Sequence, residues 1–184
     1  MLESRCTRRS GGDPLQKKAL VIIDIQNDIT KHYKDIIDNI NQAIDWAVRN
    51  DIHVVYIRHE FLSDTMKKYK PNTYGAELVS DMKIASNNVF TKNKGSALSS
   101  KEFADFVHKN EIRAFYLAGA DATACVKSTC YNLLKADCAV NVLSDCITSW
   151  DKKKIPEMLH YYESKGSKIV RLHDLLGSMN GAVE

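Results

Sequence analysis

The segment Lys18-Ala-Leu-Val-Ile-Ile-Asp24 is a continuous apolar run that ends in an acid. Such a run is typical of a strand that is buried on both faces of a parallel sheet. Further β-rich runs follow it, at residues 52–57, 88–91, 112–118, 138–143 and 168–172. Helical patterns alternate with these runs, at residues 35–49, 76–82, 100–110, 122–135, 155–164 and 174–178. The alternation predicts an α/β fold, with a six-stranded, mostly parallel sheet flanked by helices on both faces in a Rossmann-like, three-layer arrangement.

The length of 184 residues and the 44% of hydrophobic residues favour one globular domain. We expect a flexible N-terminal tail over residues 1–16 and the domain over 17–184. A net charge of +3 is too small for a nucleic-acid-binding surface. No apolar run approaches the ~20 residues of a membrane span. The composition therefore argues against a nucleic-acid or membrane partner.

The chain has five cysteines, an odd number, and no apolar signal stretch near its start. This pattern predicts free thiols in a reducing, cytoplasmic compartment. No pair has the C-x-x-C spacing of a zinc site.

Three polar residues follow three different predicted strands, where ligands bind in parallel sheets. Asp24 follows the first strand, Lys92 the third, and Cys125 a glycine turn after the fourth. Taken singly, Asp24 fits a loop cap or, with Asp28, a divalent-cation site, and Lys92 fits a solvated loop. Because parallel strands end at one edge of a sheet, the three side chains are expected to meet in one cleft. No glycine-rich turn follows Asp24, which argues against a Rossmann dinucleotide loop or a P-loop.

Cys125 stands in the first turn of a predicted helix. Unpaired N–H groups and the helix dipole favour a thiolate there, so we expect a thiol pKa below the usual ~8.5. A buried structural role fits Cys130, further inside the helix, better.

Several segments, in this order and spacing, resemble the isochorismatase-like cysteine hydrolase superfamily from Leu20 to about Leu176. They are Ala19-Leu-Val-Ile-Ile-Asp-Ile-Gln-Asn-Asp28, Tyr74-Gly-Ala-Glu-Leu78, Thr91-Lys-Asn-Lys-Gly-Ser-Ala-Leu98, Leu117-Ala-Gly-Ala-Asp-Ala-Thr-Ala-Cys-Val126 and Val142-Leu-Ser-Asp145. The resemblance implies hydrolysis of a small amide or ureide C–N bond, and a homo-oligomer, either a dimer or a tetramer.

The resemblance also implies a catalytic triad of Asp24, Lys92 and Cys125 that acts through a thioester. Asp24 would accept the thiol proton, Lys92 would stabilise the charged pair, and Cys125 would attack the carbonyl carbon. The backbone N–H groups of Asp121 and Cys125 would form the oxyanion hole. The peptide bond between Ala120 and Asp121 would be cis. The implied pocket residues are Gln26, His59, Tyr74 and Ala120.

The chain departs from the family pattern in several places. Ala122 replaces the usual threonine, and Ile29 and Leu98 replace aromatic residues. Asp121 is expected near the pocket mouth, where its charge would disfavour an anionic substrate. Arg58, by contrast, is an alternative anchor for a substrate carboxylate.

The nicotinamidase branch of the superfamily binds zinc or iron through an Asp-x-His pair and a second histidine. The matching stretch here has only His59, and no further histidine follows before His108. We therefore predict no metal, no cofactor and no ordinary nicotinamidase activity.

Two alternative functions remain open. The first is isochorismate-type vinyl ether hydrolysis, which uses Asp24 as an acid and does not need the thiol. The second is a catalytically silent scaffold, or a redox-sensing variant in which Cys125 is the reactive thiol.

Overall fold

The computed structural model describes residues 16–177 of the chain. Its sheet has six strands in the order β3-β2-β1-β4-β5-β6, and every neighbouring pair is parallel. This confirms the predicted fold class. The strands are β1 (Lys18–Ile23), β2 (His53–His59), β3 (Val89–Lys92), β4 (Ala114–Gly119), β5 (Ala139–Ile147) and β6 (Lys168–Val170). The predicted tail, apart from Gln16, lies outside the described residues.

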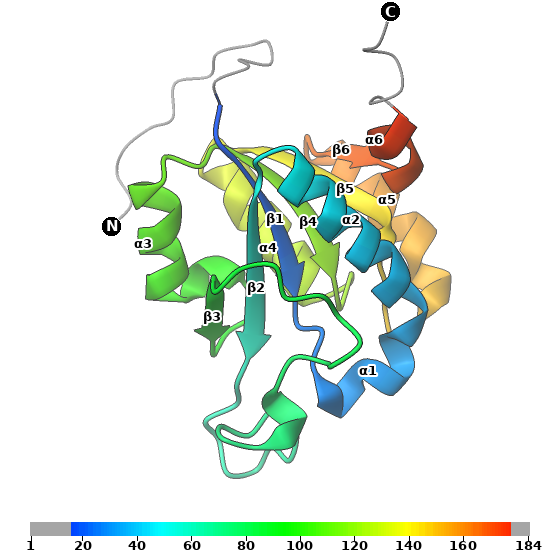
Figure 1. Cartoon of the computed structure of the whole chain (residues 1–184). Coiled ribbons are helices and arrows are strands. Elements are labelled where there is room, and N and C mark those ends of the chain that lie inside the picture. The colour runs from blue at the N-terminus through cyan, green and yellow to red at the C-terminus, as the bar shows by residue number, and fades with distance from the viewer. Residues whose placement is uncertain (1–15, 178–184) are drawn as a thin grey trace, which may run out of the picture.

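Helices cover both faces of the sheet, as Figure 1 shows. One layer holds α1 (Asn27–Tyr33), α2 (Ile37–Arg49) and α6 (Leu172–Gly177), and the other holds α3 (Lys101–Lys109), α4 (Cys125–Lys135) and α5 (Ile155–Ser164). Short 3-10 turns complete the structure: η1 (Lys34–Ile36), η2 (Tyr74–Ala76), η3 (Ala97–Ser99) and η4 (Lys152–Lys154). No helix within residues 16–177 has both the length and the apolar character that a membrane crossing needs.

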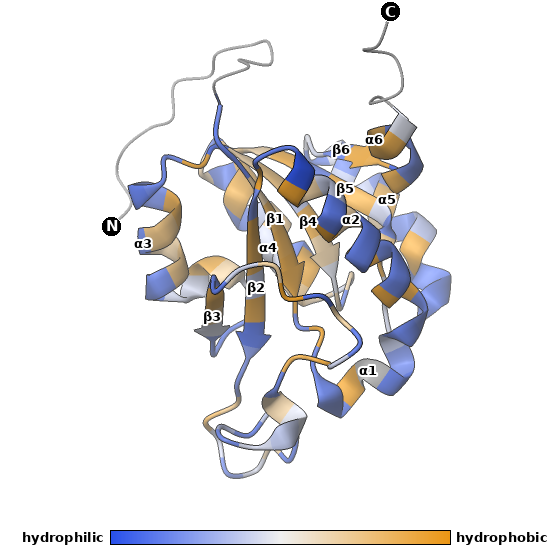
Figure 2. Cartoon of the chain, in the orientation of Figure 1, coloured by the Kyte–Doolittle hydropathy of each residue, from blue (hydrophilic) through white to orange (hydrophobic). Residues whose placement is uncertain are grey.

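The central strands are buried on both faces, which explains why their sequences are apolar without alternation. In β1, Ala19, Val21 and Ile23 face the core under α3, α4 and α5. Leu20 and Ile22 face the core under α2. Figure 2 shows these strands as an apolar centre between helices whose outer sides are hydrophilic.

Two helix predictions differ from the structure. The helix predicted over residues 76–82 is absent beyond Ala76, which ends η2. Leu78 makes a β-bridge with Gln26 and the Asn27 N–H donates to the Glu77 carbonyl, which holds the following segment extended. The helix predicted from residue 122 begins at Cys125 instead, because a turn containing a cis peptide occupies the preceding residues. Helix α1 was not expected.

Strands β1 and β4 are neighbours, but the chain leaves them toward opposite faces, to α1 after β1 and to α4 after β4. Such a point opens a crevice beyond the carboxyl ends of the strands. Gly119 ends β4 with a φ of 110°, and a Cβ there would lie 2.2 Å from the Ile23 carbonyl oxygen. Glycine therefore allows the two strand ends to approach closely.

Candidate active site

Lys92 lies at the centre of a buried polar cluster at the end of β3. Its side chain is fully buried. The Lys92 Nζ lies 2.9 Å from Asp24 Oδ2, 2.6 Å from His59 Nδ1 and 3.3 Å from Cys125 Sγ. The fold therefore brings together the three residues that the sequence places after different strands, and it adds His59.

Asp24 follows β1 in a left-handed conformation, with a φ of 56°. Its N–H donates to the Ile57 carbonyl of β2, which holds this conformation in place. A left-handed backbone conformation at a non-glycine residue costs on the order of 1 kcal/mol, and such residues concentrate at functional sites. Burial raises the pKa of the Asp24 carboxyl, and Lys92 partly offsets this effect. Within the described part of the chain, its buried Oδ1 has no hydrogen-bond partner.

Cys125 is the first residue of α4, and its side chain is partly buried. Burial and the Asp24 carboxylate raise the pKa of its thiol to about 12, and the Lys92 ammonium opposes them only in part. The prediction of a lowered thiol pKa is therefore wrong for the resting site. The helix N-terminus and Lys92 do favour the thiolate, but burial and the negative charge of Asp24 together outweigh them.

The turn before α4 contains a cis peptide bond between Ala120 and Asp121, at the position that the resemblance implied. Ala120 is fully buried. Among residues 16–177, the backbone N–H groups of Asp121 and Cys125 donate to no protein acceptor. This is the pair that was predicted as an oxyanion hole.

The Asp121 carboxylate does not act as a free charge at a pocket mouth. It accepts hydrogen bonds from the Tyr33 hydroxyl at 3.1 Å, the Ser149 hydroxyl at 2.8 Å and the Trp150 N–H at 2.7 Å. It also accepts from both the N–H and the hydroxyl of Thr123, each at 2.8 Å. Thr123 thus supplies a hydroxyl to the turn in which Ala122 replaces the family's threonine.

Gln26 is fully buried and holds main chain rather than facing a ligand. Its Nε2 donates to the carbonyls of Ala76 at 2.7 Å and His59 at 3.0 Å, and its Oε1 accepts from the His59 N–H at 2.8 Å. The prediction that Gln26 lines the substrate pocket is therefore wrong. Its side chain instead links the main chain of β2 to that of η2.

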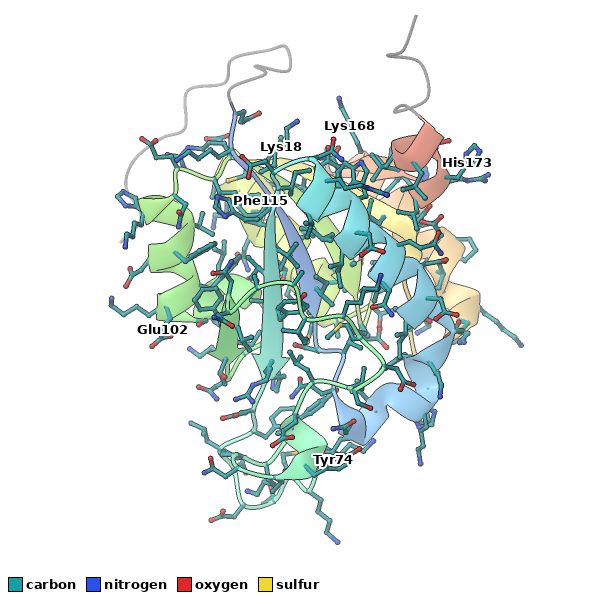
Figure 3. All side chains as sticks on the ribbon, in the orientation of Figure 1. Lys18, Tyr74, Glu102, Phe115, Lys168 and His173 are labelled. Carbon is teal, nitrogen blue, oxygen red and sulfur yellow. The ribbon has the colours of Figure 1, made fainter. Side chains whose placement is uncertain are left out.

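Tyr74 also differs from its prediction as a pocket wall, since it is 75% exposed. Figure 3 shows it on the loop beyond the carboxyl ends of the strands, far from Lys18 at the opposite edge. Tyr69, which was not predicted as a site residue, is 7% exposed, and its ring centroid lies 5.8 Å from that of His59. Its only sequence signal is an aromatic side chain in a mostly polar loop, a signal that it shares with Phe61 and Tyr74.

The described residues contain one set of side chains with the spacing of metal ligands: Asp24, His59 and Cys125, whose ligand atoms lie within 4.8 Å of one another. The Lys92 ammonium contacts all three and fills the place of a cation. The alternative cation site of Asp24 with Asp28 is also not formed. Asp28 instead accepts from the Tyr69 N–H at 2.5 Å.

These features define a class of protein: a parallel α/β fold with a buried carboxylate, ammonium and thiol at the switch point of its sheet. The chain belongs to the isochorismatase family, because the family model described as "Isochorismatase domain" matches residues 18–174. Proteins of this family are hydrolases. A search of curated protein sequences finds no match.

Solved structures share the fold at low sequence identity. An isochorismatase-like hydrolase from Alkaliphilus metalliredigens superposes with a TM-score of 0.79 at 21% identity, covering 89% of this chain and 96% of that one. The zinc complex of pyrazinamidase from Pyrococcus horikoshii superposes with a TM-score of 0.75 at 22% sequence identity, and the match covers 84% of this chain and 99% of that one. N-carbamoylsarcosine amidase from Thermoplasma acidophilum superposes with a TM-score of 0.75 at 19% sequence identity, and the match covers 85% of this chain and 97% of that one.

Proposed function

We propose that the chain is a cysteine hydrolase that cleaves a small amide or ureide C–N bond through a thioester on Cys125. The observation that carries this proposal is the position of Lys92 Nζ, 2.9 Å from Asp24 and 3.3 Å from Cys125 at the carboxyl edge of the sheet. An amidase and a pyrazinamidase among the solved structures of the same fold agree with it.

The first half of the reaction transfers the acyl group to sulfur. Asp24 accepts the thiol proton while Cys125 Sγ attacks the carbonyl carbon. The N–H groups of Asp121 and Cys125 donate hydrogen bonds to the carbonyl oxygen and stabilise the negative charge that develops on it. Asp24 then gives its proton to the leaving nitrogen, the C–N bond breaks, and ammonia or an amine departs.

The second half releases the acid. Asp24 takes a proton from water, the hydroxide attacks the thioester carbon, and the C–S bond breaks. The proton returns to sulfur and restores the thiol.

The raised pKa values of Asp24 and Cys125 fit a base and a nucleophile that exchange one proton. Moving the proton from sulfur to the carboxylate leaves the total charge of the cluster unchanged. The buried site therefore never holds two negative charges beside one ammonium.

The alternative of vinyl ether hydrolysis has one observation in its favour, the raised pKa of Asp24, which suits a general acid. Isochorismate, however, carries two carboxylates, and the two cations at the ends of β2 and β3, Arg58 and Lys92, are already paired. Lys92 binds Asp24, and Arg58 lies 3.0 Å from Glu60. A redox sensor needs a ready thiolate, which the raised pKa of Cys125 disfavours.

The test is a panel of small amides and ureides scored by ammonia release. We expect Cys125→Ala to lose activity by at least about 1,000-fold, while the matched Cys130→Ala in the same helix keeps it. An acyl adduct on Cys125, seen by mass spectrometry of the intact protein, would support the thioester. Unchanged ammonia release by Cys125→Ala would overturn the proposal. Turnover of isochorismate that needs Asp24 but not Cys125 would favour the alternative.

The homo-oligomer and the cytoplasmic location stay predictions. Light scattering of the purified protein measures the first.

A further inference from the structure

His59 presents a buried hydrogen-bond donor that the proposed reaction does not use. The ammonium of Lys92 can only donate, so His59 Nδ1, 2.6 Å away, must accept. The ring proton is then on Nε2. Burial and the Lys92 charge lower the pKa of His59 to about 4, so the ring stays neutral at neutral pH. Among residues 16–177, the buried Nε2–H has no acceptor.

Tyr69 presents a second donor of the same kind. Its ring lies 5.8 Å from that of His59, between centroids, and its hydroxyl is buried without a partner in the described part of the chain. Burial first, and then the charge of Asp24, raise the pKa of this phenol, so it remains protonated at neutral pH. Because His59 contacts Lys92, which in turn contacts Asp24 and Cys125, the Tyr69 ring lies next to this cluster.

The loop fixes the backbone of Tyr69. Its N–H donates to Asp28 at 2.5 Å, its carbonyl accepts from the Phe61 N–H at 3.0 Å, and its φ is 52°. Phe61 also packs on His59, with ring centroids 4.3 Å apart. A strained backbone that fixes a buried, unpaired hydroxyl is typical of a binding site, since an unpaired buried donor is costly in the empty protein.

We propose that His59 and Tyr69 form a two-donor subsite beside Cys125 that binds an uncharged acceptor atom of the substrate. This inference rests on the proposed function and narrows its substrate class to neutral amides or ureides with a second acceptor, such as a carbonyl oxygen or an unprotonated ring nitrogen. A carboxylate is disfavoured, because Asp24 and Asp28 lie close to this subsite and Lys92 is already paired.

The test compares two uncharged reagents that modify Cys125 without turnover. Maleimide is small and planar and has two carbonyl acceptors, so one remains for the subsite when backbone N–H groups bind the other. Methyl iodide has no such acceptor. The ratio of the two rates at Cys125, followed by peptide mass spectrometry, isolates the contribution of the subsite and cancels changes in thiol reactivity.

We expect Tyr69→Phe and His59→Asn each to lower this ratio by about threefold to tenfold, the effect of one neutral hydrogen bond. Asparagine at position 59 keeps an acceptor for Lys92 and removes only the outer donor. The controls Tyr131→Phe and His108→Asn, on exposed residues, should leave the ratio unchanged. In the wild type, iodoacetamide should outpace iodoacetate at Cys125 by more than it does in the urea-unfolded chain.

An unchanged ratio in both variants overturns the subsite, as does an equal fall of both rates, which would show that the residues act only through Lys92 and the thiol. Failure of either reagent to reach Cys125 also overturns it. A preference for iodoacetate would contradict the uncharged ligand. None of these results depends on ammonia release, so this inference and the proposed function can fail separately.

Discussion

Replacing Lys92 by methionine removes the one cation of the buried cluster and keeps much of the side-chain volume. The side chains of Lys92 and Asp24 are 0% and 4% exposed, so the carboxylate loses its counter-charge where water cannot replace it. Breaking a buried ion pair in this way costs about 3–5 kcal/mol. We expect this loss in the free energy of unfolding of Lys92→Met at pH 7.

The loss should depend on pH with a defined sign. Without Lys92, the pKa of Asp24 rises further above its unfolded value. A carboxyl whose folded pKa is raised is stabilised in its neutral form, and this stabilisation is lost as the pH rises through the folded pKa. The difference between Lys92→Met and wild type should therefore be smaller at pH 5 than at pH 8.

Urea unfolding, followed by the fluorescence of Trp46 and Trp150, measures both effects. Lys101→Met is the matched control, because Lys101 pairs with Asp105 at 2.5 Å on the surface and should matter far less. Adding Asp24→Asn to Lys92→Met should restore part of the stability, since no buried charge is left. The reasoning is refuted if Lys92→Met costs no more than Lys101→Met, or if the double variant is no more stable than Lys92→Met alone.

Three further predictions concern the residues around the cluster. Folding lowers the pKa of His59 from 6.5 to about 4. The free energy of unfolding of the wild type should therefore drop by on the order of 3 kcal/mol as the pH falls from 7 to 4. Urea titrations across this range should show that His59→Asn removes this pH dependence. In Gly75→Ala, the new Cβ would lie 2.2 Å from the Asp28 carboxylate, which accepts a hydrogen bond from Tyr69. This variant should therefore loosen the loop that carries Tyr69 and raise the KM for any amide substrate. Gly177→Ala, with open space around the new Cβ, is the control. Asp121→Asn should cost about 2–4 kcal/mol in the free energy of unfolding, because its neutral amide replaces a carboxylate that accepts five hydrogen bonds; a cost below 1 kcal/mol would contradict this account.

The sequence was sufficient to predict the sheet and the meeting of Asp24, Lys92 and Cys125. Apolar runs define the strands, and parallel strands end at one edge, so residues that follow them are brought together whatever the loops do. Helix α1 was missed because its seven residues, Asn27–Tyr33, are mostly polar and include just two large apolar residues, Ile29 and Tyr33, which pack on the core.

The lining of the site was harder to predict because it depends on loop contacts. Tyr69 and Tyr74 lie five positions apart in the same polar stretch, and nothing in their composition separates them. The difference comes from Asp28, which fixes the backbone of Tyr69, and from η2, which leaves Tyr74 exposed. Gln26 was assigned to the pocket for the same reason, since its hydrogen bonds to main chain are visible only in the folded chain.

The error in the thiol pKa follows from treating Cys125 by itself. A helix N-terminus and a nearby lysine both favour a thiolate, and each was correctly placed. The site, however, is buried, which raises the pKa of both Asp24 and Cys125, and the two acidic groups compete for the stabilisation that the single charge of Lys92 provides. In the proposed reaction, the thiol therefore rests protonated and becomes nucleophilic only as its proton moves to Asp24. Because the thiolate is also the form that oxidants attack, the raised pKa of the thiol also disfavours oxidation of Cys125 in the resting site.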